Sequence, residues 1–136
     1  MDEQLRQAIL DHLDEGRLTC QQAHAIAHQL GMEPLAVGLA ADDAGVRISR
    51  CQLGLFGYGP KAEGRHKIVH PMDDVPQRLC AQLQAAAGSE GISCAALWEV
   101  ADELGITRLE ASSAAEALGL RVSDCQLGCF PRPKKR

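Results

Sequence analysis

The chain of 136 residues repeats itself at a fixed offset. Residues 20–56 align with residues 94–130 without a gap, so a shift of 74 positions serves the whole stretch. The densest match is the segment Cys-Gln-Leu-Gly-x-Phe, which occupies residues 51–56 and occurs again at residues 125–130. Self-similarity at one period indicates duplication of a structural unit, and two copies are too few for a solenoid. The sequence therefore predicts two tandem small domains.

Each half carries the same hydrophobic pattern, which predicts three helices followed by a strand. The first helix has apolar residues at i, i+4 and i+8 and stops at Gly16; its counterpart ends near Gly88. The second helix of each half starts after a hydroxyl N-cap and closes at a glycine. These expected caps are Thr19 with Gly31, and Ser93 with Gly105.

A third helix follows after a very short turn. Pro34 suits its first turn, Leu35 and Leu39 are expected to face inward, and Gly45 ends it; the twin runs from about residue 107 to residue 118. The hydrophobic period then changes from 3.6 to 2, which predicts strands at residues 46–53 and 120–125. In the first half the loop 54–65 is expected to lead to a returning strand at residues 66–70.

The turn between the second and third helices resembles that of the helix-turn-helix superfamily. A small residue, a turn glycine and an apolar residue recur at the same spacing in both halves: Ala27, Gly31 and Val37, then Ala101, Gly105 and Ala111. The resemblance implies a mainly α fold with small β wings, built as two tandem winged-helix-like helix-turn-helix units. Unit 1 is expected at residues 1–70, a Pro- and Asp-rich linker at 71–76, and unit 2, with a basic C-terminal tail, at 77–136.

Composition and charge limit the classes of partner. Hydrophobic residues make up 46% and charged residues 24%, as in ordinary globular proteins. The formal net charge of −4 excludes a protein that coats nucleic acid or anionic membrane by bulk charge. No apolar run approaches the roughly 18 residues of a membrane helix, and the N-terminal segment does not read as a secretory signal. We expect a cytoplasmic protein without a membrane partner.

The resemblance and the basic loops together predict a non-catalytic, nucleic-acid-associated regulator, for example of transcription, that contacts the DNA backbone through its wings. Acidic residues on the third helix of unit 1, such as Asp42 and Asp43, would repel phosphate, whereas that of unit 2 offers groove candidates. The candidate contact residues are Lys61, Arg65, Lys67, Arg108, Ser112, Ser113, Arg132, Lys134, Lys135 and Arg136.

The cysteines support a third hypothesis, after the nucleic-acid regulator and a protein–protein adaptor: a thiol-based metal or redox sensor. Cys20 and Cys94 are expected at helix N-termini, where the helix dipole lowers a thiol pKa. The thiols of each unit are expected to pair, or all four repeated ones to line an interface between units. The candidate ligands, for zinc or an iron–sulfur cluster, are Cys20, Cys51, Cys94, Cys125 and Cys129. Their spacing is not that of a common zinc site, so the favoured role is that of small apolar packing residues, with no metal or other cofactor bound.

No motif indicates an enzyme, since the chain has neither a nucleophile elbow nor a phosphate loop with lysine. The second hypothesis is a protein–protein adaptor that uses the winged-helix-like units, for instance in the assembly or maturation of a metalloenzyme. For the oligomeric state, a homodimer stays open. The repeated Cys-Gln-Leu-Gly-x-Phe segment is expected to seal the core, with its glycine permitting a bend.

Overall fold

The computed structural model describes residues 2–59 and 61–131, which are mainly helical, as predicted. The helices are α1 (Glu3–Asp11), α2 (Cys20–Leu30), α3 (Pro34–Asp43), α4 (Gln77–Ala86), α5 (Cys94–Leu104) and α6 (Arg108–Ala117). Two short strands, β1 (Leu18–Thr19) and β2 (Ile48–Ser49), and a 3₁₀ turn, η1 (Lys61–Glu63), complete the elements. The bounds of α2 and α5, and those of α3 and α6, coincide at an offset of 74, so the sequence repeat is a structural repeat.

The predicted caps of the second helix in each half are confirmed. The hydroxyl of Thr19 accepts a hydrogen bond from the Gln22 N–H, and the hydroxyl of Ser93 accepts one from the Ala96 N–H. Each helix then ends on a glycine in the left-handed region, with φ of 64° at Gly31 and 68° at Gly105. A side chain would strain the backbone there, so the glycine fixes where the chain turns into the third helix.

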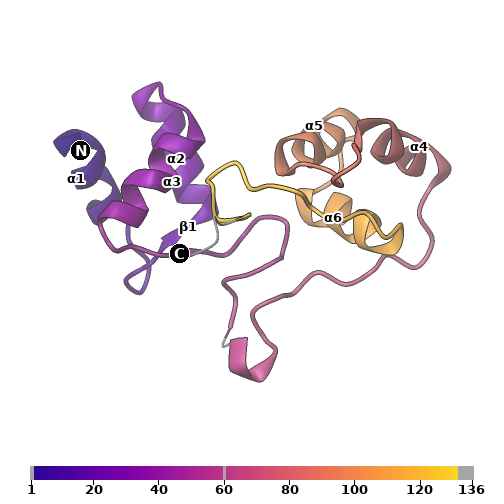
Figure 1. Ribbon diagram of the computed structural model, residues 1–136, viewed down its shortest axis with the longest axis horizontal. Helices are drawn as coiled ribbons and strands as arrows, with labels where there is room; N and C mark the ends of the chain where they lie inside the picture. The colour runs from indigo at the N-terminus through magenta and orange to yellow at the C-terminus, as the bar shows by residue number, and fades with distance from the viewer. Residues whose placement is uncertain (1, 60, 132–136) are drawn as a thin grey trace.

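The helices form two groups of three, α1–α3 and α4–α6, joined by a long irregular segment that contains the expected linker (Figure 1). Ile9, Ile26 and Val37 are buried in the first group. Leu83 and Leu97 are among the residues buried in the second group. No helix in the described part of the chain is long and apolar enough to cross a membrane.

The strands are shorter than predicted and pair in parallel. Leu18 and Thr19 pair with Ile48 and Ser49, and a single bridge joins the equivalent Ile92 and Val122. The returning strand expected at residues 66–70 was wrong, because that stretch is irregular in the structure. The N–H groups of Ile68 and Val69 both donate to one carbonyl, that of Gly54, at 2.9 and 3.1 Å, so no strand ladder can form there. The described residues thus contain no antiparallel wing.

The expectation that Leu35 and Leu39 face inward was also wrong. They are 48% and 56% exposed, whereas Val37, Ala40 and Ala41 are buried. Residues 37, 40 and 41 form one helical stripe at i, i+3 and i+4, and this stripe faces α1 and α2. The core side of α3 is therefore lined mostly by small residues, which lets the helices approach closely.

The repeated segments 51–56 and 125–130, hereafter the exchanged loops, each pack on the opposite half of the molecule. Leu127 is 2% exposed and lies in the core of α1–α3, while Leu53 is 1% exposed and lies in the core of α4–α6. Figure 1 shows the C-terminal segment, in yellow, running from the second group of helices to the first. The prediction that these leucines seal a core is confirmed, but each seals the core of the other half.

Candidate thiol site between the two halves

The two exchanged loops have the same backbone geometry. In the first, the Cys51 N–H donates to the Phe56 carbonyl at 3.2 Å and the Gly54 N–H donates to the Cys51 carbonyl at 2.8 Å. The equivalent hydrogen bonds of the second loop, which starts at Cys125, measure 2.9 and 3.0 Å. Glycine at the turn has φ of 73° in the first loop and 78° in the second, as the predicted bend requires. Each loop is therefore a closed turn with a cysteine at its base.

The glycines of the exchanged loops account for the exposed leucines of the third helices. A Cβ on Gly54 would lie 2.6 Å from Leu109 Cδ1, and a Cβ on Gly128 would lie 2.7 Å from Leu35 Cδ1. Leu35 and Leu109 occupy equivalent positions, so each contacts the loop of the other half. The rings of Phe56 and Phe130 meet edge to face between the halves, with centroids 6.4 Å apart.

Four cysteines gather where the loops meet the second helices. The Cys20 thiol lies within electrostatic range of the thiols of Cys51, Cys94 and Cys125. Cys20 and Cys94 begin α2 and α5, whereas Cys51 and Cys125 belong to the exchanged loops. No cysteine in the described residues takes part in a disulfide. Cys20 thus lies near the other repeated cysteine of its own half and near both repeated cysteines of the other half.

The expectation that the helix N-termini lower the thiol pKa of Cys20 and Cys94 was wrong. Burial raises the pKa of Cys20 to about 12 and that of Cys94 to about 11. Burial likewise raises the pKa of Cys51. Removing a thiolate from water costs more free energy than the dipole returns, because the first helical turn is largely covered by packed side chains.

Hydrogen-bond donors are nevertheless directed at these sulfurs. The Leu127 N–H donates to Cys125 Sγ at 3.3 Å, and the Gln126 side-chain amide donates to Cys94 Sγ at 3.4 Å. The N–H groups of residues 53, 54 and 55 favour the thiolate of Cys51 in the same way. At Cys125 a hydrogen bond from the Cys129 thiol outweighs burial and lowers the pKa to about 6. Successive N–H groups around a sulfur form the kind of concavity that stabilises a thiolate.

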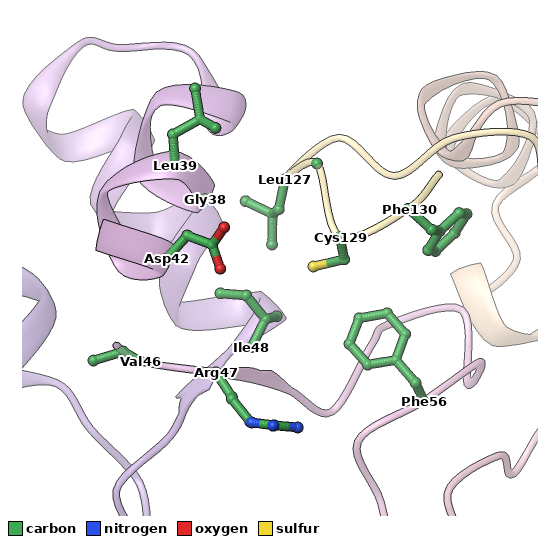
Figure 2. Close-up of a pocket in the computed structure, with 11 residues that line it drawn as sticks. Gly38, Leu39, Asp42, Val46, Arg47, Ile48, Phe56, Leu127, Cys129 and Phe130 are labelled. Carbon is green, nitrogen blue, oxygen red and sulfur yellow. The ribbon is translucent and has the colours of Figure 1, made fainter. Parts of the chain in front are cut away.

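An open cleft of about 580 Å³ lies beside the second exchanged loop. Figure 2 shows that α3, residues 46–48 and the loop surround it, with Cys129 and both phenylalanines on its loop side. The second exchanged loop packs directly against α3 at Gly38, since a Cβ there would lie 1.8 Å from the Leu127 carbonyl oxygen. No three His, Cys, Asp or Glu side chains of the described residues are arranged to hold a single metal ion.

The predicted groove residues of α6 are engaged inside the molecule. The Arg108 guanidinium lies 3.6 Å above the Trp98 ring and donates to the Gln52 side-chain oxygen at 2.7 Å. Ser112 is 1% exposed, and its hydroxyl has no hydrogen-bond partner among the described residues. The Ser113 hydroxyl donates to the His70 carbonyl.

The predicted wing residues are described only in part. Arg65 pairs with Glu63 at 3.4 Å, and Lys67 pairs with Glu116 of α6 at 3.0 Å. Both basic side chains are largely exposed, so these ion pairs are weak. The Lys61 side chain and the tail residues Arg132, Lys134, Lys135 and Arg136 lie outside the described residues.

Sequence reasoning missed the aromatic junction around Trp98. His24 and Trp98 occupy equivalent positions of α2 and α5, and their rings lie 4.3 Å apart across the two halves. Burial, followed by the charge of Arg108, lowers the His24 pKa to about 4. The repeat offset aligns His24 with Trp98, and this alignment could have indicated their contact, because equivalent positions of the two halves meet at the junction.

The chain was compared with protein families, curated proteins and solved structures, and nothing matches in any of the three. Inferences about its role therefore rest on the site itself.

Proposed function

We propose that this protein is a non-catalytic, thiol-based sensor made of two helix-turn-helix-like units whose relative placement depends on the thiols between them. The observation that carries the proposal is the gathering of Cys20, Cys51, Cys94 and Cys125 at the junction of the halves. The repeated turn glycines and the matching helix bounds support the assignment of each half to the helix-turn-helix type. The absence of catalytic motifs in the sequence agrees with a regulatory role.

The exchanged loops connect the thiols to the hydrophobic cores of the two halves. Cys51 and Cys125 lie two residues before Leu53 and Leu127, each of which fills the core of the opposite half. Burying a leucine contributes about 1.5–3 kcal/mol, so a covalent change that pulls a loop outward loosens the junction by a comparable free energy. A chemical event at one sulfur therefore alters how the two halves are held together.

Trp98 provides an intrinsic probe, because it is the single tryptophan and lies between the halves. Diamide removes two hydrogen atoms from a thiol pair and leaves a disulfide, while the reagent is reduced to a hydrazine. We expect diamide to shift Trp98 emission and dithiothreitol to restore it. Cys80→Ser should respond like the natural chain, whereas Cys125→Ser should not. Unchanged emission after complete disulfide formation at Cys125, verified by mass spectrometry, would refute the sensor.

We further propose that the sensor acts by contacting a nucleic-acid backbone. The two turn patterns and the basic residues Arg65 and Lys67 support it, together with the tail residues Lys134 and Lys135. Because Arg108 is held by Trp98 and Gln52, the proposal assigns it no base contact. Duplex affinity should fall as salt rises, and alanine at Lys134 and Lys135 should weaken binding to all sequences alike. An affinity independent of salt overturns this output and favours a protein partner.

A further inference from the structure

We propose that Cys20, Cys51, Cys94 and Cys125 are the four ligands of an iron–sulfur cluster held between the two halves. The inference rests on the proposed function, because it names the group that the thiol sensor holds. Each half supplies one thiol from the start of its second helix and one from its exchanged loop. Four cysteine thiolates are the usual ligand set of such clusters.

The positions of the four thiols match what a shared cofactor requires. Cys20, Cys51 and Cys94 are buried, and Cys125 is partly buried, so solvent reaches the junction mainly from the side of the second loop. Four cysteines from four separate chain segments have little reason to meet for packing alone, since alanine or valine would fill the same space. All four recur as cysteines at the repeat offset, whereas Cys129 aligns with Leu55 and Cys80 lies outside the aligned stretch.

The donors around the sulfurs fit metal-bound thiolates better than thiols. A neutral thiol is a weak acceptor, yet Cys125 receives the Leu127 N–H and Cys94 receives the Gln126 side-chain amide. Hydrogen bonds to the cysteine sulfurs are a regular part of iron–sulfur sites, where they offset the negative charge of the cluster and its ligands. Gln126 thus gains a role that sealing a core does not require, whereas the side-chain oxygen of the equivalent Gln52 accepts from Arg108.

A cluster and a single ion require different separations of the sulfur atoms. Tetrahedral zinc at about 2.3 Å from each sulfur needs sulfur atoms about 3.8 Å apart. No three potential ligands of the described residues converge to hold one ion, although the four thiols are near enough to interact electrostatically. A cluster places bridging sulfides and several irons between its cysteines, so it spans thiols that stand farther apart.

The test uses the whole chain, without oxygen, and a synthetic [4Fe–4S] cluster that carries four 2-mercaptoethanol ligands. In the exchange each cysteine thiol gives its proton to the departing 2-mercaptoethanol, and its sulfur takes the vacated iron. We expect about four irons and four sulfides to stay with each chain after gel filtration, with visible charge-transfer absorption. Zinc alone, added in a parallel sample, should not reach one ion per chain.

Two further measurements make the ligand assignment specific. Cys80→Ser should retain the full iron content, whereas Cys51→Ser and Cys125→Ser should lose at least three quarters of it while keeping the helical circular dichroism. Where a variant fails to fold, the ligand assignment is tested instead by alkylating the thiols of the natural chain with and without the cluster. Both Cys125 and Cys80 are partly exposed, and loading should protect Cys125 alone.

Retention of no iron, equal iron in the Cys80 and Cys125 variants, or an unprotected Cys125 overturns the cluster. If Trp98 still responds to diamide in that case, the sensor stands without it. Conversely, if the chain binds the cluster but Trp98 emission does not respond to diamide, the sensor proposal is wrong and the cluster site stands.

Discussion

Replacing Leu127 by alanine should destabilise the first group of helices, although the residue follows the second group in the chain. Leu127 is 2% exposed within the core of α1–α3, and truncation of a buried leucine typically costs 2–5 kcal/mol. A loss of about 3 kcal/mol corresponds to a roughly 150-fold faster exchange of amides that open with that core. Leu53→Ala should produce the same acceleration in α4–α6 instead.

Hydrogen exchange followed by mass spectrometry resolves the two halves. The matched control is Leu39→Ala, because Leu39 is 56% exposed and its truncation should change exchange little. If Leu127→Ala accelerated exchange in α4–α6 and left α1–α3 unchanged, each loop would pack on its own half. The exchanged arrangement, and the shared thiol site that depends on it, would then be wrong.

Three other changes test single features of the structure. Gly38→Ala should cost about 1–3 kcal/mol in urea unfolding, because its Cβ would meet the Leu127 carbonyl, whereas Gly88→Ala, with nothing nearer than 3.9 Å, should stay within about 0.5 kcal/mol. Thr107→Ala should cost about 1 kcal/mol in the same assay by removing the capping box of α6; an unchanged midpoint would contradict that cap. The His24 pKa, lowered from 6.5 to about 4 by burial and then Arg108, makes the unfolded chain bind the proton more tightly. Stability should therefore be complete above pH 6.5 and fall by about 1 kcal/mol toward pH 4, less than the full shift implies because the ring is partly exposed; His24→Gln should flatten this slope.

Much of the local structure was readable from single positions. Thr19, Ser93 and the glycines at 31 and 105 determined where the second helices begin and end, because a cap acts through hydrogen bonds to residues two to four places away. The bend at Gly54 followed from the same kind of local rule. The inward placement of Leu35 failed because its contact comes from the loop of the other half, which no periodicity within α3 records. Leu39 is 56% exposed, because the core stripe of α3 runs through Val37, Ala40 and Ala41 instead.

The site depended on information that is spread over both halves. The repeat identified the thiols, yet the sequence left open whether they pair within a unit or across units. It also assigned Arg108 to a nucleic-acid groove, since the residues that hold it, Trp98 and Gln52, lie 10 and 56 positions away. Burial reversed the expected pKa shift of Cys20 for the same reason, because desolvation depends on what the tertiary structure places around the sulfur.

By itself the sequence determined that a three-helix unit occurs twice and that each copy is followed by the same segment, with a cysteine and a bend at a glycine. Only the tertiary structure decided that each of these segments packs on the core of the opposite half. Because the two turns share most of their residues, either one presents a leucine that fits either core, and local preference cannot choose between them. The choice lies in contacts between distant residues, such as the approach of the Leu127 carbonyl to Gly38, where the equivalent position of the other half carries the larger Ser112.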